Sequence, residues 1–167
     1  MLIETLRGIA LIAATLTTGL VAGLFYAYAM SVMPGLSRAE DRTFVDAMQR
    51  INAAILNGWF ALAFGGAPVL MIVSAALQLG PDGRTVVFAW IVAALVLYAV
   101  MLVITFVVNV PLNNTLDAAG APDRIDDVAS VRKHFEATWV RWNVARSVAS
   151  AGAFACLAWS LVLLGGS

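Results

Sequence analysis

Four long stretches of the chain contain no charged residue, and this feature limits the possible fold more than any other. The uncharged stretches cover residues 8–33, 51–79, 85–116 and 147–167. Each is long enough to cross the hydrocarbon core of a bilayer as a helix, which takes about 20 apolar residues. Helices pair their backbone groups within the segment, and the stretches lack the two-residue alternation of transmembrane β-strands.

The sequence therefore predicts an all-α integral membrane protein in a single domain of residues 1–167. The expected spans are residues 8–33, 54–79, 85–110 and 144–165.

Composition supports this class and excludes others. Of the 167 residues, 62% are hydrophobic and 12% are charged, whereas a soluble domain is about half apolar and a quarter charged. Ten basic and ten acidic residues balance, so we expect no nucleic-acid partner. With one cysteine, Cys156, and one histidine, His134, we expect no disulfide within the chain and no metal site. A haem or metal held between subunits through His134 stays an alternative.

The first stretch has a second interpretation, a cleaved signal peptide. Residues 27–29, Ala-Tyr-Ala, resemble a signal-peptidase site. The apolar run that begins at Gly8 is longer than the roughly 7–15 residues of a signal-peptide core, and Glu4 precedes it. These two features favour a retained span.

Proline and glycine mark the expected ends of helices in the first half. Pro34 and Gly35 are predicted to end the first span. Ser37 and Glu40 have the spacing of a capping box, which predicts the start of a new, amphipathic helix.

Similar signals divide the second half. Residues 81–83, Pro-Asp-Gly, predict a tight turn between the second and third spans. Pro111 is predicted to break the third helix. Residues 120–122 then separate that region from a polar helix expected to begin near Asp123.

Basic residues predict the orientation in the membrane. The first and third loops hold eight of them: Arg38, Arg42, Arg50, Arg124, Arg132, Lys133, Arg141 and Arg146. The other side holds only Arg7 and Arg84. The positive-inside rule then places both loops in the cytoplasm and both termini outside, in a membrane of the bacterial inner-membrane type.

The two halves of the chain share a layout and a short motif. Residues 50–54 and 141–145 both read Arg-x-Asn-x-Ala, each where an amphipathic helix is expected to meet a span. A repeat of this kind would be parallel, about an axis along the membrane normal; a chance match is the alternative. The expected fold is a four-helix bundle of two parallel-repeat hairpins, each with a cytoplasmic amphipathic helix. Asn52 and Asn143 would then face each other across the cytoplasmic mouth.

Asparagine side chains gather at the cytoplasmic ends of the spans. They are Asn52, Asn57, Asn109, Asn113, Asn114 and Asn143. Because an amide is costly in lipid without a partner, this placement has two interpretations. The amides either cap helices and hold them together, or they line a polar pocket.

The polar helix before the last span has one notable face. That face carries Phe135, Trp139, Trp142, Asn143 and Arg146, and Glu136 lies at its edge. The tryptophans suit either an aromatic belt at the lipid headgroups or a flat apolar pocket. The arginine either extends to lipid phosphates or points inward to an anion.

Four segments together resemble the DUF1772 membrane proteins, which are called anthrone oxygenase-like. The segments are residues 19–36, 48–52, 109–116 and 139–147, and the resemblance covers nearly the whole chain. It implies a four-span protein, and some relatives oxidise anthrones to anthraquinones with O₂ and without an evident cofactor. The family offers no established catalytic residues to carry over, so only the positions of its motifs indicate candidates.

Residue chemistry and resemblance together predict an oxygenase-like protein that acts on a flat, hydrophobic anthrone- or quinol-like substrate without a cofactor. The catalytic candidates are Glu136 as base, with His134 as a less well placed base, and Asn143 and Arg146 as enolate partners. The substrate-binding candidates are Asn52, Asn109, Asn113, Trp139 and Trp142.

Other functions stay open at this point. The main one is a non-enzymatic membrane protein that binds a lipid, a quinone or a protein partner. Transport driven by ions is disfavoured because the span centres hold no ionisable residue. Gly19 and Gly23 are spaced for close helix packing, either within the bundle or in a homo-oligomer.

Overall fold

The computed structural model describes residues 2–80 and 83–166, and these residues form helices and turns without a strand. The first half contains α1 (Leu2–Ala27), π-helical η1 (Tyr28–Val32), α2 (Met33–Leu36), α3 (Asp41–Ala54) and α4 (Gly58–Leu77). The second half contains α5 (Thr85–Ile104), π-helical η2 (Thr105–Asn109), α6 (Val110–Ala118), the 3₁₀ turn η3 (Pro122–Arg124) and α7 (Val128–Gly165).

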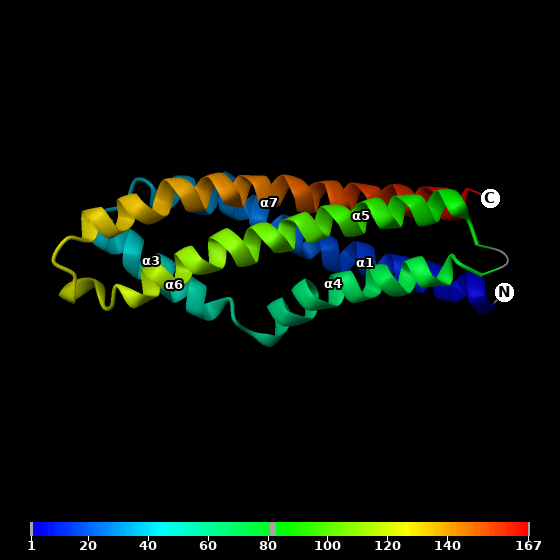
Figure 1. Cartoon of the computed structure of the whole chain (residues 1–167), viewed down its shortest axis with the longest axis horizontal. Helices are drawn as coiled ribbons and strands as arrows, with labels where there is room; N and C mark the ends of the chain where they lie inside the picture. The colour runs from blue at the N-terminus through cyan, green and yellow to red at the C-terminus, as the bar shows by residue number, and fades with distance from the viewer. Residues whose placement is uncertain (1, 81–82, 167) are drawn as a thin grey trace.

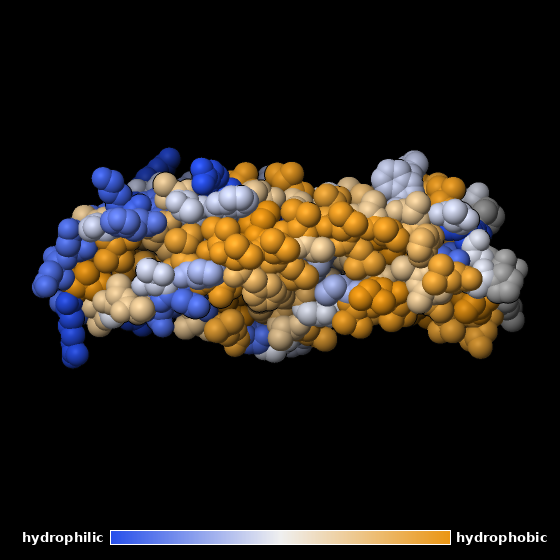
Figure 2. Space-filling view, viewed as in Figure 1, coloured by the Kyte–Doolittle hydropathy of each residue, from blue (hydrophilic) through white to orange (hydrophobic). Residues whose placement is uncertain are grey.

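Four continuous rods dominate the arrangement (Figure 1). They are Leu2–Leu36, Gly58–Leu77, Thr85–Ala118 and Val128–Gly165, and each is long and apolar enough to span a bilayer. This confirms the predicted all-α membrane bundle. Figure 2 shows the matching surface, an apolar belt along the flank and a strongly hydrophilic cap at one end.

The rods pack in a ring in which α1 contacts α4 and α7, and α5 contacts α7 and α4. Both termini lie at one end of the bundle, and α3 and the link between α6 and α7 lie at the other (Figure 1). We call the latter the polar end. It is the end for which the basic residues predict a cytoplasmic location.

Two apolar clusters fill the interior. The longer one follows the bundle axis and includes Leu11, Val21, Met71, Ile91, Tyr98 and Leu157. The shorter one lies at the polar end and includes Met33, Phe44, Met48, Leu116, Phe135 and Trp139. The amphipathic helix α3 therefore covers the end of the bundle with its apolar face.

The prediction that Pro34 and Pro111 end their helices is wrong. Each proline lies in the first turn of the α-helix that follows a π-helical turn, η1 or η2. The wide π turn shifts the hydrogen-bond register just before the proline, so the missing N–H interrupts no α-helical bond and the rod continues. The first and third rods consequently extend beyond the predicted spans, to Leu36 and Ala118.

The predicted capping box is also absent. Because α2 continues to Leu36, Ser37 caps the end of α2, and its hydroxyl donates to the carbonyl of Pro34 at 2.9 Å. Helix α3 begins at Asp41, and Glu40 precedes it without a side-chain capping bond.

The helix boundaries after α6 lie closer to the turn residues that were predicted from the sequence. Gly120 has a positive φ of 85° and ends the helical region after α6. Helix α7 begins at Val128 rather than near Asp123, because Asp127 caps it by accepting from the Ser130 N–H at 2.9 Å. The predicted turn at 81–83 falls mostly outside the described residues, which include only Gly83 of the three.

The two halves meet through residues that share the spacing of the two Arg-x-Asn-x-Ala copies. Asp41 and Arg132, which are 91 residues apart, form an ion pair at 2.9 Å. Phe44 and Phe135 have the same spacing, and their ring centroids are 6.1 Å apart. Residues related by a two-fold axis touch each other only near that axis, so these contacts support the predicted repeat.

The repeat is imperfect where the amphipathic helices meet the spans. In the first half the chain breaks between Ala54 and Gly58, whereas in the second half α7 continues through residues 141–145 without interruption. Asn52 and Asn143 were expected to face each other across the cytoplasmic mouth, but Asn143 is fully buried, and of the two only Asn52 lines a cavity at this end. Asn143 donates to the carbonyl of Phe25 at 3.2 Å.

Candidate functional site

A cavity of about 370 Å³ lies near the polar end, at the break between α3 and α4. Asn57 shapes this break: it accepts from the Phe60 N–H at 3.0 Å and donates to the Ala54 carbonyl at 2.8 Å. The chain therefore stops one helix and starts the next without a continuous axis. The space left beside the break is lined by residues from α1, η1, α3, α4, η2, α6 and α7.

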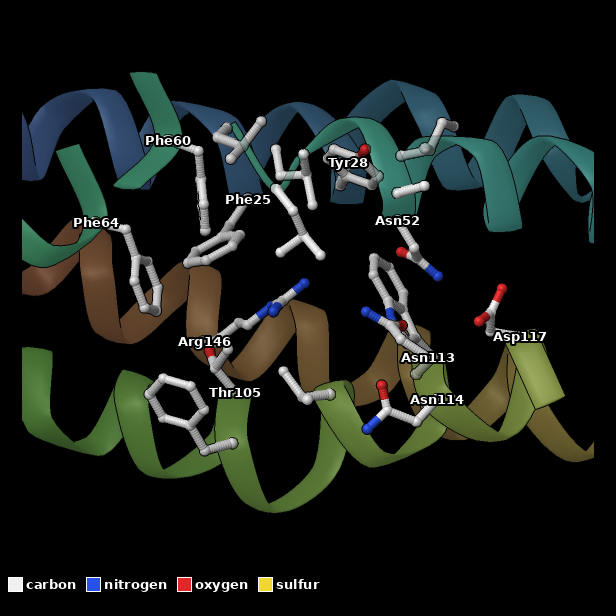
Figure 3. A pocket seen from close by; sticks show the side chains of 18 of the residues that line it. Phe25, Tyr28, Asn52, Phe60, Phe64, Thr105, Asn113, Asn114, Asp117 and Arg146 are labelled. Atoms are coloured by element: carbon white, nitrogen blue, oxygen red, sulfur yellow. The ribbon is translucent and has the colours of Figure 1, made fainter. Parts of the chain in front are cut away.

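Aromatic rings form much of the cavity wall (Figure 3). Phe60 and Phe64, one turn apart on α4, stack with centroids 4.8 Å apart. Elsewhere in the wall the ring centroids of Tyr28 and Trp139 lie 5.8 Å apart. Such walls suit a flat apolar ligand, because rings attract one another in stacked and edge-on arrangements.

Arg146 is the cationic group of the cavity. Its side chain is only 7% exposed, yet none of the ion pairs among the described residues includes it. The guanidinium carbon lies 4.1 Å from the ring centroid of Phe25 and 5.1 Å from that of Trp139. In Figure 3 the guanidinium projects into the cavity. A buried cation without an anion is costly, and contact with rings offsets only part of that cost. The cavity therefore favours a ligand that carries negative charge.

Asn143 and Asn109 support the wall from behind and do not line it. The fully buried Asn143 accepts from Nε of Arg146 at 3.1 Å, which fixes the direction of the guanidinium. Asn109 donates to the Trp139 carbonyl at 3.3 Å, and its own Oδ1 is buried without a hydrogen-bond partner.

Asn113 and Asn52 line the cavity itself. Asn113 accepts from Nε1 of Trp139 at 2.7 Å and so holds the indole in the wall. The Nδ2 donor of Asn52 is buried and has no partner. A hydrogen-bond acceptor on a ligand would satisfy it.

Three candidates from the sequence lie away from this cavity: Glu136, Trp142 and His134. Glu136 accepts from Nε of Arg132 at 2.7 Å and lines a separate surface cavity. It shares a helical face with Asn143, but a rise of about 1.5 Å per residue puts it roughly 15 Å from Arg146 along α7. Trp142 is half-buried away from the cavity, where its ring lies 5.8 Å from the guanidinium of Arg141.

Of the nine sequence candidates, the structure thus places Asn52, Asn113, Trp139 and Arg146 in the cavity wall. Several lining residues were missed by the sequence reasoning: Phe25, Tyr28, Phe60, Phe64, Thr105 and Asp117. The helical spacing of Phe60 with Phe64 was a usable signal, as was that of Asn113 with Asp117. The latter was hidden by the expectation that Pro111 breaks the helix.

Metal-ligating residues do not gather anywhere in the described part of the chain, where no three His, Cys, Asp or Glu side chains are grouped. His134, the other candidate base, is exposed, and its Nδ1 lies 2.7 Å from the Ser130 carbonyl. It lines a different cavity.

Comparison with known proteins identifies the family. The sequence profile of the anthrone oxygenase family matches residues 57–156, which is more than half of the chain and includes Asn113, Trp139 and Arg146. No curated protein and no solved structure matches the chain. The chain therefore belongs to the anthrone oxygenase family.

Proposed function

We propose that the protein oxidises a flat, hydrophobic aromatic substrate of the anthrone or quinol type with O₂, and that the aromatic cavity is its site. The observation that carries the proposal is Arg146, a buried cation that faces ring-lined space without a carboxylate partner among the described residues. The cavity volume of about 370 Å³ suits a small molecule, since such sites measure about 300–1,000 Å³.

For this reaction the protein must hold the ring, supply a base and stabilise the oxyanion. Loss of a proton from the ring CH₂ gives an enolate, whose oxygen faces the guanidinium of Arg146. The electron-rich carbon passes one electron to O₂, and the resulting radical and superoxide join in a C–O bond. The peroxide anion takes up a proton from water and then loses water to leave a carbonyl. In total the substrate loses two hydrogens and gains one oxygen, and the second oxygen atom leaves as water.

The membrane location supports this substrate class. A tricyclic aromatic ketone partitions into the bilayer, and the cavity lies in the polar end of a membrane bundle, beside lipid-facing side chains such as Leu56 and Phe106 in its wall. The family description, anthrone oxygenase, agrees with the same class.

The test is O₂ consumption by the purified protein in lipid nanodiscs with anthrone as substrate, corrected for the protein-free rate. We expect one O₂ consumed per anthraquinone formed, without hydrogen peroxide. Arg146→Gln should lower the rate at least tenfold, and Arg146→Lys should restore part of it. Arg141→Gln, an exposed arginine on the same helix, is the control for loss of charge.

Two results would contradict the proposal. One is wild-type O₂ uptake no faster than the protein-free rate. The other is equal rates for wild type and Arg146→Gln. Tight anthrone binding without O₂ uptake would favour the non-enzymatic binding protein instead.

A further inference from the structure

We propose that Asp117 is the general base of this cavity, an inference that rests on the proposed oxidation. Asp117 is the only carboxylate among the described residues that line the cavity. In Figure 3 it lies at the opposite end of the lining side chains from Phe64, with Arg146 between them. The cavity therefore has an aromatic inner part that holds the cation and a polar mouth that holds the carboxylate.

The backbone on both sides of Asp117 is fixed, whereas the carboxylate is unengaged. Nε2 of Gln49, another lining residue, donates to the carbonyls of Leu116 at 2.8 Å and Gly120 at 3.0 Å. The hydrogen bonds and ion pairs of the described residues give the Asp117 carboxylate no partner. A base needs this combination of fixed position and free lone pairs.

Arg146 and Asp117 lie apart along the cavity (Figure 3), as the two reacting positions of the substrate do along its central ring. In an anthrone the carbonyl carbon and the CH₂ carbon occupy opposite edges of the central ring. With the carbonyl oxygen against Arg146, the CH₂ edge faces the mouth and Asp117. The carboxylate takes the proton as the C–H electron pair moves into the enolate, and it then passes the proton to water, since Asp117 is exposed.

Asn52 adds a donor to the polar mouth. Its buried Nδ2 lacks a partner and lies in the same part of the cavity as Asn113 and Asp117 (Figure 3). This donor is available to the oxygen that the reacting carbon gains from O₂. The mouth thus combines a proton acceptor and a hydrogen-bond donor at the edge where the C–O bond forms.

The other charged groups around Asp117 fall into three sets: those that line the same cavity, those that form ion pairs, and those that are exposed away from the cavity. Within the cavity wall the other titratable groups among the described residues are Arg146 and Tyr28. On the packed elements α3, η3 and α7 the ion pairs are Arg50 with Asp46, Arg42 with Asp123, and Arg132 with Asp41 and Glu136. The remaining charged groups there, Arg124, Lys133, His134 and Arg141, are exposed and line no part of this cavity.

The experiment compares wild type, Asp117→Asn and Asp126→Asn in nanodiscs, with Asp126 as an exposed carboxylate outside the cavity. We expect Asp117→Asn to lower kcat about 100-fold, the scale of general-base catalysis. Anthrone affinity, measured by quenching of tryptophan fluorescence, should change less than threefold. The acid limb of the wild-type pH–rate profile should disappear in Asp117→Asn, and Asp126→Asn should behave as wild type.

A second substrate separates a base from a structural role. An anthrone with electron-withdrawing ring substituents, already ionised at the assay pH, needs no base, so Asp117→Asn should oxidise it at close to the wild-type rate. Equal losses with both substrates, or an unchanged kcat and pH profile with anthrone, would overturn the role of Asp117 while leaving the oxidation itself in place. A loss of the acid limb in Tyr28→Phe but not in Asp117→Asn would assign the base to Tyr28. A wild type that consumes no O₂ would overturn both proposals.

Discussion

Asn143 accepts from Nε of Arg146 at 3.1 Å, one turn later on α7, and donates from its own Nδ2 to the carbonyl of Phe25 on α1 at 3.2 Å. One buried amide therefore joins two helices and aims the cation of the cavity. Phe25 completes the arrangement, because its ring lies 4.1 Å from the same guanidinium. The position of Arg146 depends on packing between α1 and α7 as much as on α7 itself.

Asn143→Ala should weaken both the bundle and the cavity. It leaves the Phe25 carbonyl and the Arg146 Nε–H without their partner, at a cost of about 1–3 kcal/mol in the free energy of unfolding. Asn143→Asp should bind Arg146 as an ion pair and neutralise it, so affinity for an anionic aromatic ligand should fall more than tenfold. Thermal unfolding and ligand titration in nanodiscs measure the two effects. Unchanged affinity in Asn143→Asp would contradict the assignment of Arg146 as the anion-binding group.

Trp139 lies in the cavity wall, so its fluorescence should respond to a bound ligand. Trp139→Phe removes the 2.7 Å bond to Asn113 and should lower the free energy of unfolding by about 1 kcal/mol. It should also remove most of the fluorescence quenching by a flat aromatic ligand. Trp59→Phe is the matched control, because Trp59 on α4 is 84% exposed and lines no described cavity. Quenching that survives in Trp139→Phe would place the ligand elsewhere.

The sequence was sufficient for features that follow from local patterns. Uncharged length predicted the spans, and the clustering of asparagines predicted the polar end. The helical spacing placed Phe135, Trp139, Asn143 and Arg146 on one face but left open whether that face turns to lipid or inward, and the structure buries all four. Each of these depends only on residue type and on helical geometry.

The missed features depend on bonds between distant segments. Pro111 breaks a regular α-helix, but a π turn before it removes the conflict, and nothing local in the sequence marks that turn. Glu136 shares a face with Asn143, but Arg132 and α3 hold it at the surface. The cavity arises from the break between α3 and α4, which the first half has and the second half lacks. An imperfect repeat of this kind appears only once both halves are folded.

Arg132 holds the polar end together. Its guanidinium donates to Asp41 at 2.9 Å, to the carbonyls of Ala39 at 2.8 Å and Ser37 at 2.9 Å, and to Glu136. Arg132→Met should lower the free energy of unfolding by about 2–3 kcal/mol, because hydrogen bonds to charged groups are stronger than those between neutral groups. The loop before α3 should then become sensitive to proteolysis, as read by mass mapping of limited digests.

Arg38→Met is the control for Arg132→Met, since Arg38 is exposed in the same loop. Equal proteolysis of the two variants would show that Arg132 does not anchor the loop.

Gly19 and Gly23 should respond differently to substitution. A Cβ at Gly19 would lie 2.9 Å from Cε2 of Phe154, whereas a Cβ at Gly23 would meet nothing within 4 Å. Gly19→Leu should therefore destabilise the bundle by about 1–3 kcal/mol through overpacking, and Gly23→Leu should not. Thermal unfolding of the two variants in detergent measures the difference. The reverse order, or dissociation of an oligomer by Gly23→Leu, would indicate that this face of α1 packs against another subunit.

The polar end should face the cytoplasm. Eight of the ten basic residues lie at that end, and the two at the other end are engaged with helix termini. Arg7 donates to the Leu77 carbonyl at 2.9 Å at the end of α4, and Arg84 donates to the Leu164 carbonyl at 2.7 Å at the end of α7. Their charges therefore complement helix dipoles and do not mark a cytoplasmic loop. In a Cys156→Ser background, Asp126→Cys should react with a membrane-impermeant maleimide only in inside-out vesicles, and Thr85→Cys only in right-side-out vesicles. The opposite pattern would invert the topology and would place the cavity mouth, and the proton released from Asp117, on the outer side.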